Sequence, residues 1–209
     1  MRTLAVCTFL LMLPFVASAA RVEDANLAFT IDIPEGFEPD PAMLAAKAEF
    51  VHAFAKDDPA GGLSTIIIIE RMRGTIGRER LDPAKLPPGF KGKLFTAKWN
   101  GFDVEATEVA EELNGVPTVN YNAQVPLKRE AVQLRVVGPR SKDKELRALL
   151  DQLLAGLKGE TNWTTLPAPS AAAGALKRNS VIAGVVVCTG ACAAILWLLM
   201  RRGRSNRVN

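Results

Sequence analysis

The sequence predicts an α+β domain, built on an antiparallel sheet of about six to seven strands flanked by helices, followed by one C-terminal transmembrane helix. Three observations predict this class. Several consecutive segments alternate between apolar and polar residues, and two of their junctions are Asn-Gly pairs that favour hairpin turns. Leucines recur at helical spacing over 146–157, as in a helix that packs one face on a sheet. Residues 181–200 carry no charge and can cross a hydrocarbon core of about 30 Å.

The N-terminal half of the domain is expected to contribute three strands and a short helix. Residues 27–33 alternate strictly, which predicts a half-buried strand. A short helix is expected at 41–47 and a second strand at 49–55. Residues 63–69 include four consecutive isoleucines, apolar on both faces, and therefore suit a central strand. The segment 71–92 is rich in glycine and proline and is expected to form a long loop.

The C-terminal half is expected to be a four-stranded antiparallel meander closed by a helix. The meander strands are predicted at 93–99, 102–113, 116–125 and 131–137. Asn100-Gly101 and Asn114-Gly115 join the first three, because both residue types tolerate the positive φ of a type I′ turn. For the helix, Ser141 is a suitable N-cap and Gly159 a suitable stop residue.

The N-terminus is typical of a secretory signal peptide, assigned to residues 1–20. Arg2 is a minimal basic region, residues 4–15 are apolar, and Ala17-Ser18-Ala19 is a cleavage signal. Cleavage near Ala19 or Ala20 would place the new N-terminus outside the membrane.

The C-terminal features agree with this orientation. Residues 161–179 are an Ala/Pro-rich tether, 180–200 the transmembrane helix and 201–209 a cytoplasmic tail. Four arginines follow the helix, against two basic residues just before it, as the positive-inside rule requires. The sequence therefore predicts a single-pass protein of the cytoplasmic membrane, which contacts lipid through one span and displays residues 21–160 outside.

The basic character of the chain belongs to its membrane flanks. Seven of the 26 Lys and Arg residues lie in the signal peptide, beside the span or in the tail, whereas all 22 Asp and Glu residues lie within 23–160. The outside domain therefore has a net charge of −3, which argues against nucleic-acid binding. It contains no cysteine, because Cys7 lies in the signal peptide and Cys188 and Cys192 in the span. No disulfide is expected to hold it.

The opening Phe-Thr-Ile-Asp-Ile-Pro-Glu-Gly-Phe of residues 29–37 resembles the start of the PsbP/Mog1/DcrB-like group. A strand around Tyr121, a strand ending at Val137 and a leucine-rich terminal helix at 141–157 follow in the same order, so the resemblance covers about residues 27–158. It implies an α/β/α sandwich and a small non-enzymatic domain that acts by contact, as in photosystem assembly factors, Ran-binding proteins and envelope lipoproteins. The chain lacks a lipobox and has a C-terminal span instead, and no functional residue is carried over.

Two groups of polar residues are candidates for partner binding. The first is a locally basic stretch in the Pro/Gly-rich loop, suited to lipid headgroups or an acidic partner. The second is the polar face of the meander, suited to a peptide, glycan or protein if it is open. Ordinary solvated surface is the alternative for both. The candidate residues are Arg71, Arg73, Arg78, Arg80, Asn120, Asn122, Gln124 and Arg135.

Within the span, Gly184, Cys188 and Cys192 recur every four residues. Small residues at this spacing allow two helices to pack closely, so a homodimer through the transmembrane helix is one interpretation. A generic small-residue anchor is the other.

Catalytic, metal and cofactor sites are not expected. His52 is the only histidine, and it lies between Phe50 and Phe54, where a core or boundary role is the commoner one. The sequence thus favours a non-enzymatic binding or assembly module with a protein partner. A small-ligand or lipid-sensing domain, with a pocket between sheet and helix, is the alternative. A hydrolase would depend on His52.

Overall fold

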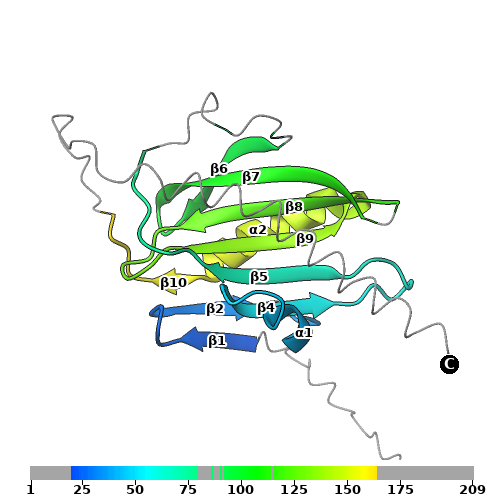
Figure 1. Ribbon diagram of the computed structural model, residues 1–209, viewed down its shortest axis with the longest axis horizontal. Helices are drawn as coiled ribbons and strands as arrows, with labels where there is room; N and C mark the ends of the chain where they lie inside the picture. Colours follow the sequence, from blue (N-terminus) through cyan, green and yellow to red (C-terminus); the bar gives the residue numbers. More distant parts are fainter. Residues whose placement is uncertain (1–19, 80–85, 87–89, 91, 114, 164–209) are drawn as a thin grey trace, which may run out of the picture.

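The structure, a computed structural model, describes residues 20–79, 86, 90, 92–113 and 115–163. Its main feature is a seven-stranded antiparallel sheet with the order β3-β4-β5-β9-β8-β7-β6 (Figure 1). The strands are β3 (Glu38–Pro39), β4 (Phe50–Lys56), β5 (Thr65–Arg71), β6 (Lys93–Trp99), β7 (Phe102–Leu113), β8 (Val116–Val125) and β9 (Val132–Pro139). The predicted sheet-rich α+β class is confirmed, and β6 to β9 form the predicted meander.

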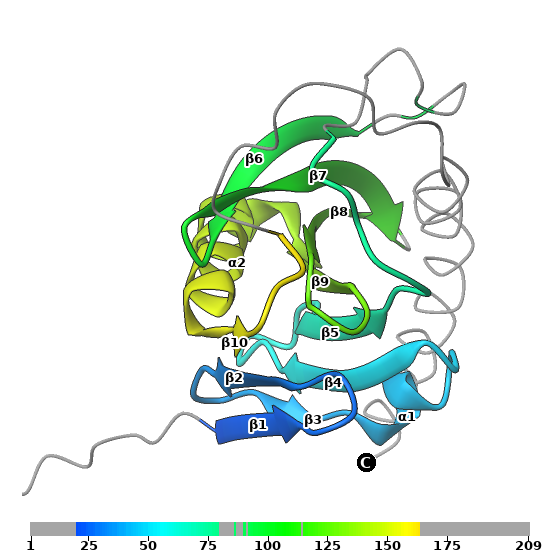
Figure 2. The ribbon, with the colours of Figure 1, turned by 90° about the vertical axis from the view of Figure 1, so that its left-hand side faces the viewer.

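A second, three-stranded sheet lies beside the first. It has the order β1-β2-β10, formed by Ala20–Asp24, Phe29–Ile33 and Lys158–Gly159. Figure 2 shows helix α2 (Asp143–Gly156) against one face of the large sheet, with β1 and β2 at the lower side of the molecule. On the opposite face the described helix is α1 (Pro41–Leu44), a single turn beside β4. The sandwich is therefore unequal in its two outer layers.

The turns explain why the meander was predictable. β6, β7 and β8 have the predicted bounds, and Asn100 and Gly101 between β6 and β7 have φ values of 47° and 79°. Gly115, in the next turn, has φ of 78°. Apart from Asn and Asp, residues that carry a Cβ rarely adopt a positive φ. The Asn-Gly pair therefore determines where each hairpin reverses.

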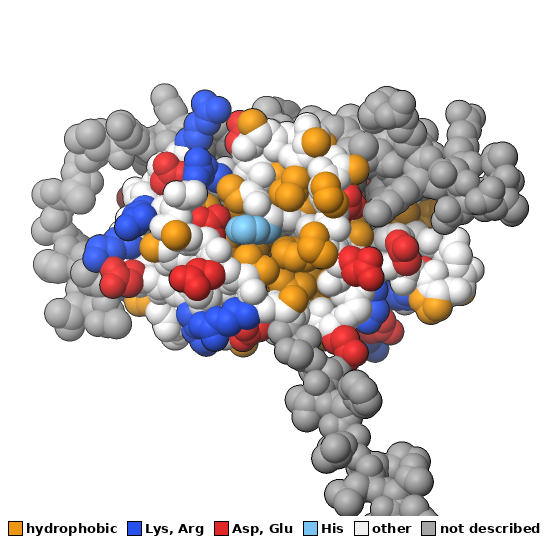
Figure 3. Space-filling view, turned by 90° about the horizontal axis from the view of Figure 1, so that it is seen from below, with side chains coloured by type: hydrophobic (Ala, Val, Ile, Leu, Met, Phe, Trp, Pro, Cys, Tyr) orange, Lys and Arg blue, Asp and Glu red, His pale blue; other side chains and the backbone are white. Residues whose placement is uncertain are grey.

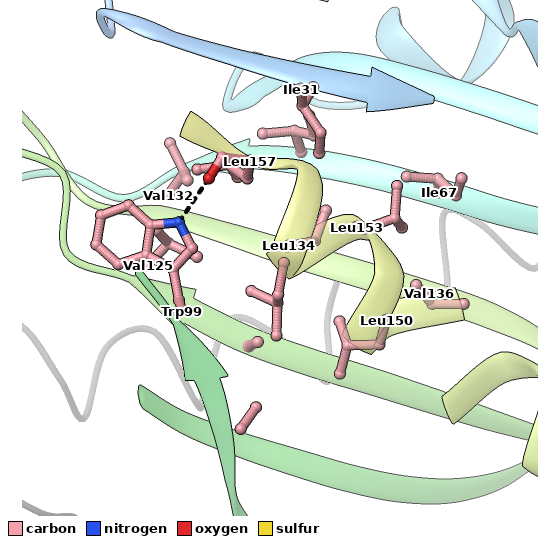
Figure 4. Close-up of a cluster of buried hydrophobic side chains, with 14 of the residues drawn as sticks. Ile31, Ile67, Trp99, Val125, Val132, Leu134, Val136, Leu150, Leu153 and Leu157 are labelled. Carbon is pink, nitrogen blue, oxygen red and sulfur yellow. Dashed lines mark hydrogen bonds between the residues drawn. The ribbon is translucent and has the colours of Figure 1, made fainter. Parts of the chain in front are cut away.

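The main core lies between α2, β2 and the large sheet. Figure 4 shows the leucines of α2 directed at strand residues such as Ile31, Ile67 and Val136. The Trp99 indole Nε1 donates a hydrogen bond to the Leu157 carbonyl oxygen at 3.0 Å, so this buried donor is satisfied and the end of α2 is fixed to β6. Of the predicted leucine stripe, Leu149 is partly buried and the following are fully buried: Leu146, Leu150, Leu153, Leu154 and Leu157.

Both predicted helix signals were wrong. Ser141 lies in a 3₁₀ turn, Arg140–Lys142, which leads directly into α2, and no side chain caps the helix. The helix ends at Gly156, because Leu157 is extended and the chain continues into β10. Gly159 is needed there for close approach: a Cβ would lie 2.7 Å from Leu127 Cδ2 and 3.2 Å from the Ala28 carbonyl oxygen.

The predicted transmembrane helix, the tail and most of the tether lie outside the described residues, as does the predicted signal peptide except Ala20, which begins β1. Within the described part of the chain, no helix has both the length and the hydropathy needed to cross a membrane.

Tyr121, the only tyrosine, links the meander to α2 and gives a direct test of the core. Its hydroxyl donates to Asp143 Oδ1 at 2.6 Å. Burial, and then the bond to Asp143, raise the pKa of the phenol above its ordinary value of 10.0. Because the folded pKa is raised, the stability that this proton contributes is present below about pH 10 and is lost as the pH rises further. We expect the ultraviolet absorbance of the phenolate to titrate at higher pH in the folded chain than in denaturant. Equal midpoints would contradict the buried hydrogen bond.

Candidate functional site

The first candidate surface is the segment that follows β5. Two backbone hydrogen bonds tie it to the turn between β8 and β9: Met72 N–H donates to the Ala131 carbonyl at 2.9 Å, and Ala131 N–H donates to the Gly74 carbonyl at 2.8 Å. Part of the predicted loop is therefore held against the end of the sheet.

Two aromatic rings hold the next part of the same segment. The Trp163 indole Nε1 donates to the Ile76 carbonyl at 2.8 Å, and its ring meets Phe102 edge to face at 5.8 Å. The Arg78 guanidinium lies 5.0 Å from the Phe102 ring centre and 5.7 Å from that of Trp163. We call Phe102 and Trp163 the aromatic platform. It supports an exposed arginine through cation–π contacts.

The other predicted arginines of this segment differ in exposure. Arg71 Nε lies 3.2 Å from Glu130 Oε2, and both side chains are about half-exposed. The Arg73 side chain is 86% exposed, and its Nη2 lies 3.3 Å from Glu49 Oε1. An ion pair at this exposure is worth little energetically, so Arg73 can exchange partners at small cost. Arg80 lies outside the described residues.

The β8–β9 turn adds two more basic side chains. Lys128 Nζ lies 2.6 Å from Glu160 Oε2, and Arg129 Nη1 donates to the Ala25 and Asn26 carbonyls, each at 3.1 Å. We call the whole cluster the basic end of the domain. It comprises Arg71, Arg73, Arg78, Lys128 and Arg129.

The second candidate surface, the polar face of the meander, is buried. Strand register places Thr107, Asn122 and Arg135 side by side across β7, β8 and β9. Three residues that were expected to be open to solvent are buried instead: Asn120 and Asn122 are each 4% exposed, and Arg135 is 0% exposed. Gln124 is half-buried. The expectation of an open face is therefore corrected for these three residues.

Ionic and amide contacts explain how polar groups are accommodated there. Arg135 Nη2 donates to Glu70 Oε2 at 2.8 Å, and Lys47 pairs with the other oxygen of the same carboxylate. Asn122 Nδ2 donates to Thr107 Oγ1 at 3.2 Å, and Gln133 Nε2 lies 3.4 Å from Asn122 Oδ1. Buried charges are stable only when paired in this way. The network thus has an evident structural role.

Glu70 and Lys47 were missed by sequence reasoning. Glu70 ends the isoleucine run of β5 and lies 65 residues before its partner Arg135. No local pattern connects them. The one available hint is that a strand predicted to be buried ends in a glutamate. A buried carboxylate requires a cationic partner, so the sequence could have indicated that such a partner exists but not which residue it is.

His52 makes a contact that the sequence did not predict. Its Nε2 lies 3.2 Å from Asp24 Oδ2, while Asp24 Oδ1 accepts the Asn26 and Leu27 N–H groups at 2.9 Å each. Its ring meets Phe29 edge to face at 6.0 Å. Figure 3 shows the histidine at the surface among apolar side chains. The described residues include no cluster of three or more metal-ligating side chains. Among the other candidates, Gly184, Cys188 and Cys192 lie outside the described range.

No protein-family model matches the chain, and no curated protein matches it in sequence. Similar solved structures include a Bacteroides thetaiotaomicron protein (11% identity, TM-score 0.48), LpqN, involved in cell envelope biogenesis of Mycobacterium tuberculosis (15%, 0.40), and the Saccharomyces cerevisiae Ran-binding protein Mog1p (14%, 0.43). The matches cover 72%, 67% and 69% of this chain and 52%, 89% and 97% of those chains, so it spans about half of the Bacteroides protein. All three likenesses are at low identity with TM-scores below 0.5; they concern the fold alone and say nothing about function.

The buried ion network predicts a strongly asymmetric mutational response. Glu70→Ala removes the carboxylate that bonds Arg135 and Lys47, and we expect a loss of about 3–5 kcal/mol in the free energy of unfolding. Replacing both partners, Glu70→Leu with Arg135→Met, should cost less, because no charge is left buried without its counter-ion. Exposed Glu112→Ala is the control and should change stability by about 0.5 kcal/mol or less. Urea unfolding measures all three. A Glu70→Ala variant as stable as the control would contradict a structural role.

Proposed function

We propose that this chain is a non-enzymatic binding module held on the outside of the cytoplasmic membrane by a C-terminal transmembrane helix, and that its basic end binds an acidic segment of a partner protein. The signal-peptide pattern, the uncharged segment 181–200 and the arginines after it support the anchoring and orientation.

The observation that carries the binding site is the position of Arg78 on the aromatic platform. A guanidinium held by two rings loses less side-chain freedom when it binds a carboxylate than one extended into water. Arginine and tryptophan are also the residue types that most often dominate protein interfaces. Arg73, highly exposed in the same segment, supplies a second cation.

Burial favours the basic end over the polar face of the meander. Asn120, Asn122 and Arg135 are nearly or fully inaccessible, and Arg135 is bonded to Glu70. A partner at that face would have to compete with the buried network. At the basic end, by contrast, Arg73 and Arg78 are exposed, and hydrogen bonds to the backbone of Met72, Gly74 and Ile76 hold the segment that carries them.

The basic end also lies at the N-terminal end of the predicted tether. Trp163 belongs to the platform, and the 16 residues from 164 to 179 separate it from the predicted span. Fully extended, they would reach at most roughly 55 Å. The site would therefore remain within a few tens of ångströms of the membrane surface, where a membrane-bound partner is accessible.

Site-specific photo-cross-linking in native membranes tests this proposal. A photoreactive amino acid at Thr75, which is exposed between Arg73 and Arg78, should give a discrete adduct with a partner protein. The same group at Ala148, exposed on α2, should not give that adduct. We expect Arg73→Glu with Arg78→Glu to reduce the Thr75 adduct by about tenfold, because two attractive contacts become repulsive.

The matched control is Arg140→Glu with Lys144→Glu, which changes the charge equally at two exposed positions, one in the turn before α2 and one in its first turn. This variant should retain the adduct. Equal yields from the two double variants would show that the basic end does not select the partner. An adduct consisting of lipid rather than protein would also overturn the proposal, in favour of a headgroup-binding surface.

A further inference from the structure

Strand β1 is an edge strand with one available side. It pairs with β2 along its whole length, from Ala20 opposite Ile33 to Asp24 opposite Phe29. Among the described strands none pairs with its other side, and it is the outermost ribbon at the lower side in Figures 1 and 2. An exposed edge of this kind offers its unpaired N–H and C=O groups to another strand.

The side chains of β1 carry opposite charges two residues apart. Arg21 and Glu23 are exposed, and they share the solvent face of the small sheet with their cross-strand neighbours Asp32 and Thr30. Val22, between them, points to the other face and packs against the main core. Along β1 the side chains are therefore positively charged at Arg21, apolar at Val22 and negatively charged at Glu23.

Antiparallel pairing of β1 with the β1 of a second copy allows few registers. Along a strand, the backbone N–H and C=O groups of successive residues point alternately to one side and to the other. In an antiparallel pair, two opposed residues must both point these groups toward the partner strand or both away from it. A two-fold axis relating the two copies of β1 therefore has to pass between a residue and its own counterpart in the other copy. An axis through Arg21 would oppose two arginines, and an axis through Glu23 would oppose two glutamates. An axis through Val22 opposes each Arg21 to the Glu23 of the other copy.

We propose that β1 is a self-recognition edge, at which two copies of this chain join antiparallel about Val22 into a continuous six-stranded sheet, β10-β2-β1-β1-β2-β10. The charge complementarity selects the second copy as the occupant, because one register satisfies both ion pairs at once. This surface is independent of the basic end. It also differs from the small-residue spacing in the predicted span, and both can operate in one dimer.

The contact is small, and its strength depends on concentration. Five residues from each copy make the strand pairing, less than a typical stable interface provides. Dimers should therefore be sparse in dilute solution and abundant where copies are confined together. Arg21, Val22 and Glu23 lie after both predicted cleavage points, so processing at either would leave these three residues in place.

Cysteine cross-linking of the full chain tests the register. In a background with Cys7, Cys188 and Cys192 replaced by serine, Val22→Cys should form a disulfide-linked dimer under mild oxidation in detergent micelles. Opposed residues have Cα atoms about 4.5–5.5 Å apart, which a disulfide can bridge. Asp32→Cys, exposed on β2, is the position control. Its two copies would be separated by three strand spacings, about 14 Å, and should not cross-link.

Charge variants in the Val22→Cys background test the recognition. Arg21→Glu alone and Glu23→Arg alone each place like charges opposite one another, and we expect cross-linking to slow about fivefold. The double exchange, Arg21→Glu with Glu23→Arg, restores both ion pairs and should return to the parental rate. Mixing the two single variants should give a heterodimer faster than either gives a homodimer.

Three results would overturn the proposal. One is the absence of a Val22→Cys dimer, and another is an Asp32→Cys dimer formed at the same rate. The third is equal rates for the parent, the single charge variants and the double exchange, because collision in a micelle does not distinguish charge patterns. Circular dichroism of each variant checks that the substitutions, at partly buried Val22 and at exposed Arg21, Glu23 and Asp32, leave the fold unchanged.

Discussion

The fold depends on the pairing of β5 with β9. Six residue pairs, from Ile66 opposite Val137 to Arg71 opposite Val132, join the N-terminal strands β3, β4 and β5 to the meander β6 to β9. Without them the chain would form two smaller sheets, each with an open edge. On one face the seam supplies buried isoleucine, leucine and valine side chains beneath α2, and on the other it carries the Glu70–Arg135 ion pair. No disulfide assists, because Ala20 to Trp163 contains no cysteine.

The same seam assembles the basic end. Since β5 and β9 are antiparallel neighbours, the segment leaving β5 runs beside the turn that enters β9, and Met72 and Gly74 bond with Ala131. The chain after α2 returns to this end through β10, which brings Trp163 onto Ile76 and Phe102. The candidate site therefore combines three segments that are far apart in sequence, and the placement of Arg78 is a consequence of strand order.

Sequence predicted the features that local physics decides. Asn-Gly turns gave the bounds of β6, β7 and β8, and the leucine stripe gave α2 and its buried face. Short strands were missed: β10 has two residues, and β1 has one large apolar side chain, so neither shows a clear alternation.

Gly159 was assigned to a helix end because the pairing of β10 with β2 cannot be seen locally. The polar face was expected to be open because Arg135 gives no sign of a partner 65 residues away, and the contact of Arg78 with Trp163 was hidden for the same reason.

Native-state hydrogen exchange of the full chain tests most directly whether β5 and β9 unite the domain. If the seam makes one cooperative sheet, the paired amides of residues 66–71 and 132–137 should open only with the whole domain, at one common and highest free energy. The amides of β4 should follow the same opening through their pairing with β5. Exchange of residues 66–71 at a clearly lower free energy than the meander amides would contradict the account, because the N-terminal strands would then be an add-on to an independently stable meander.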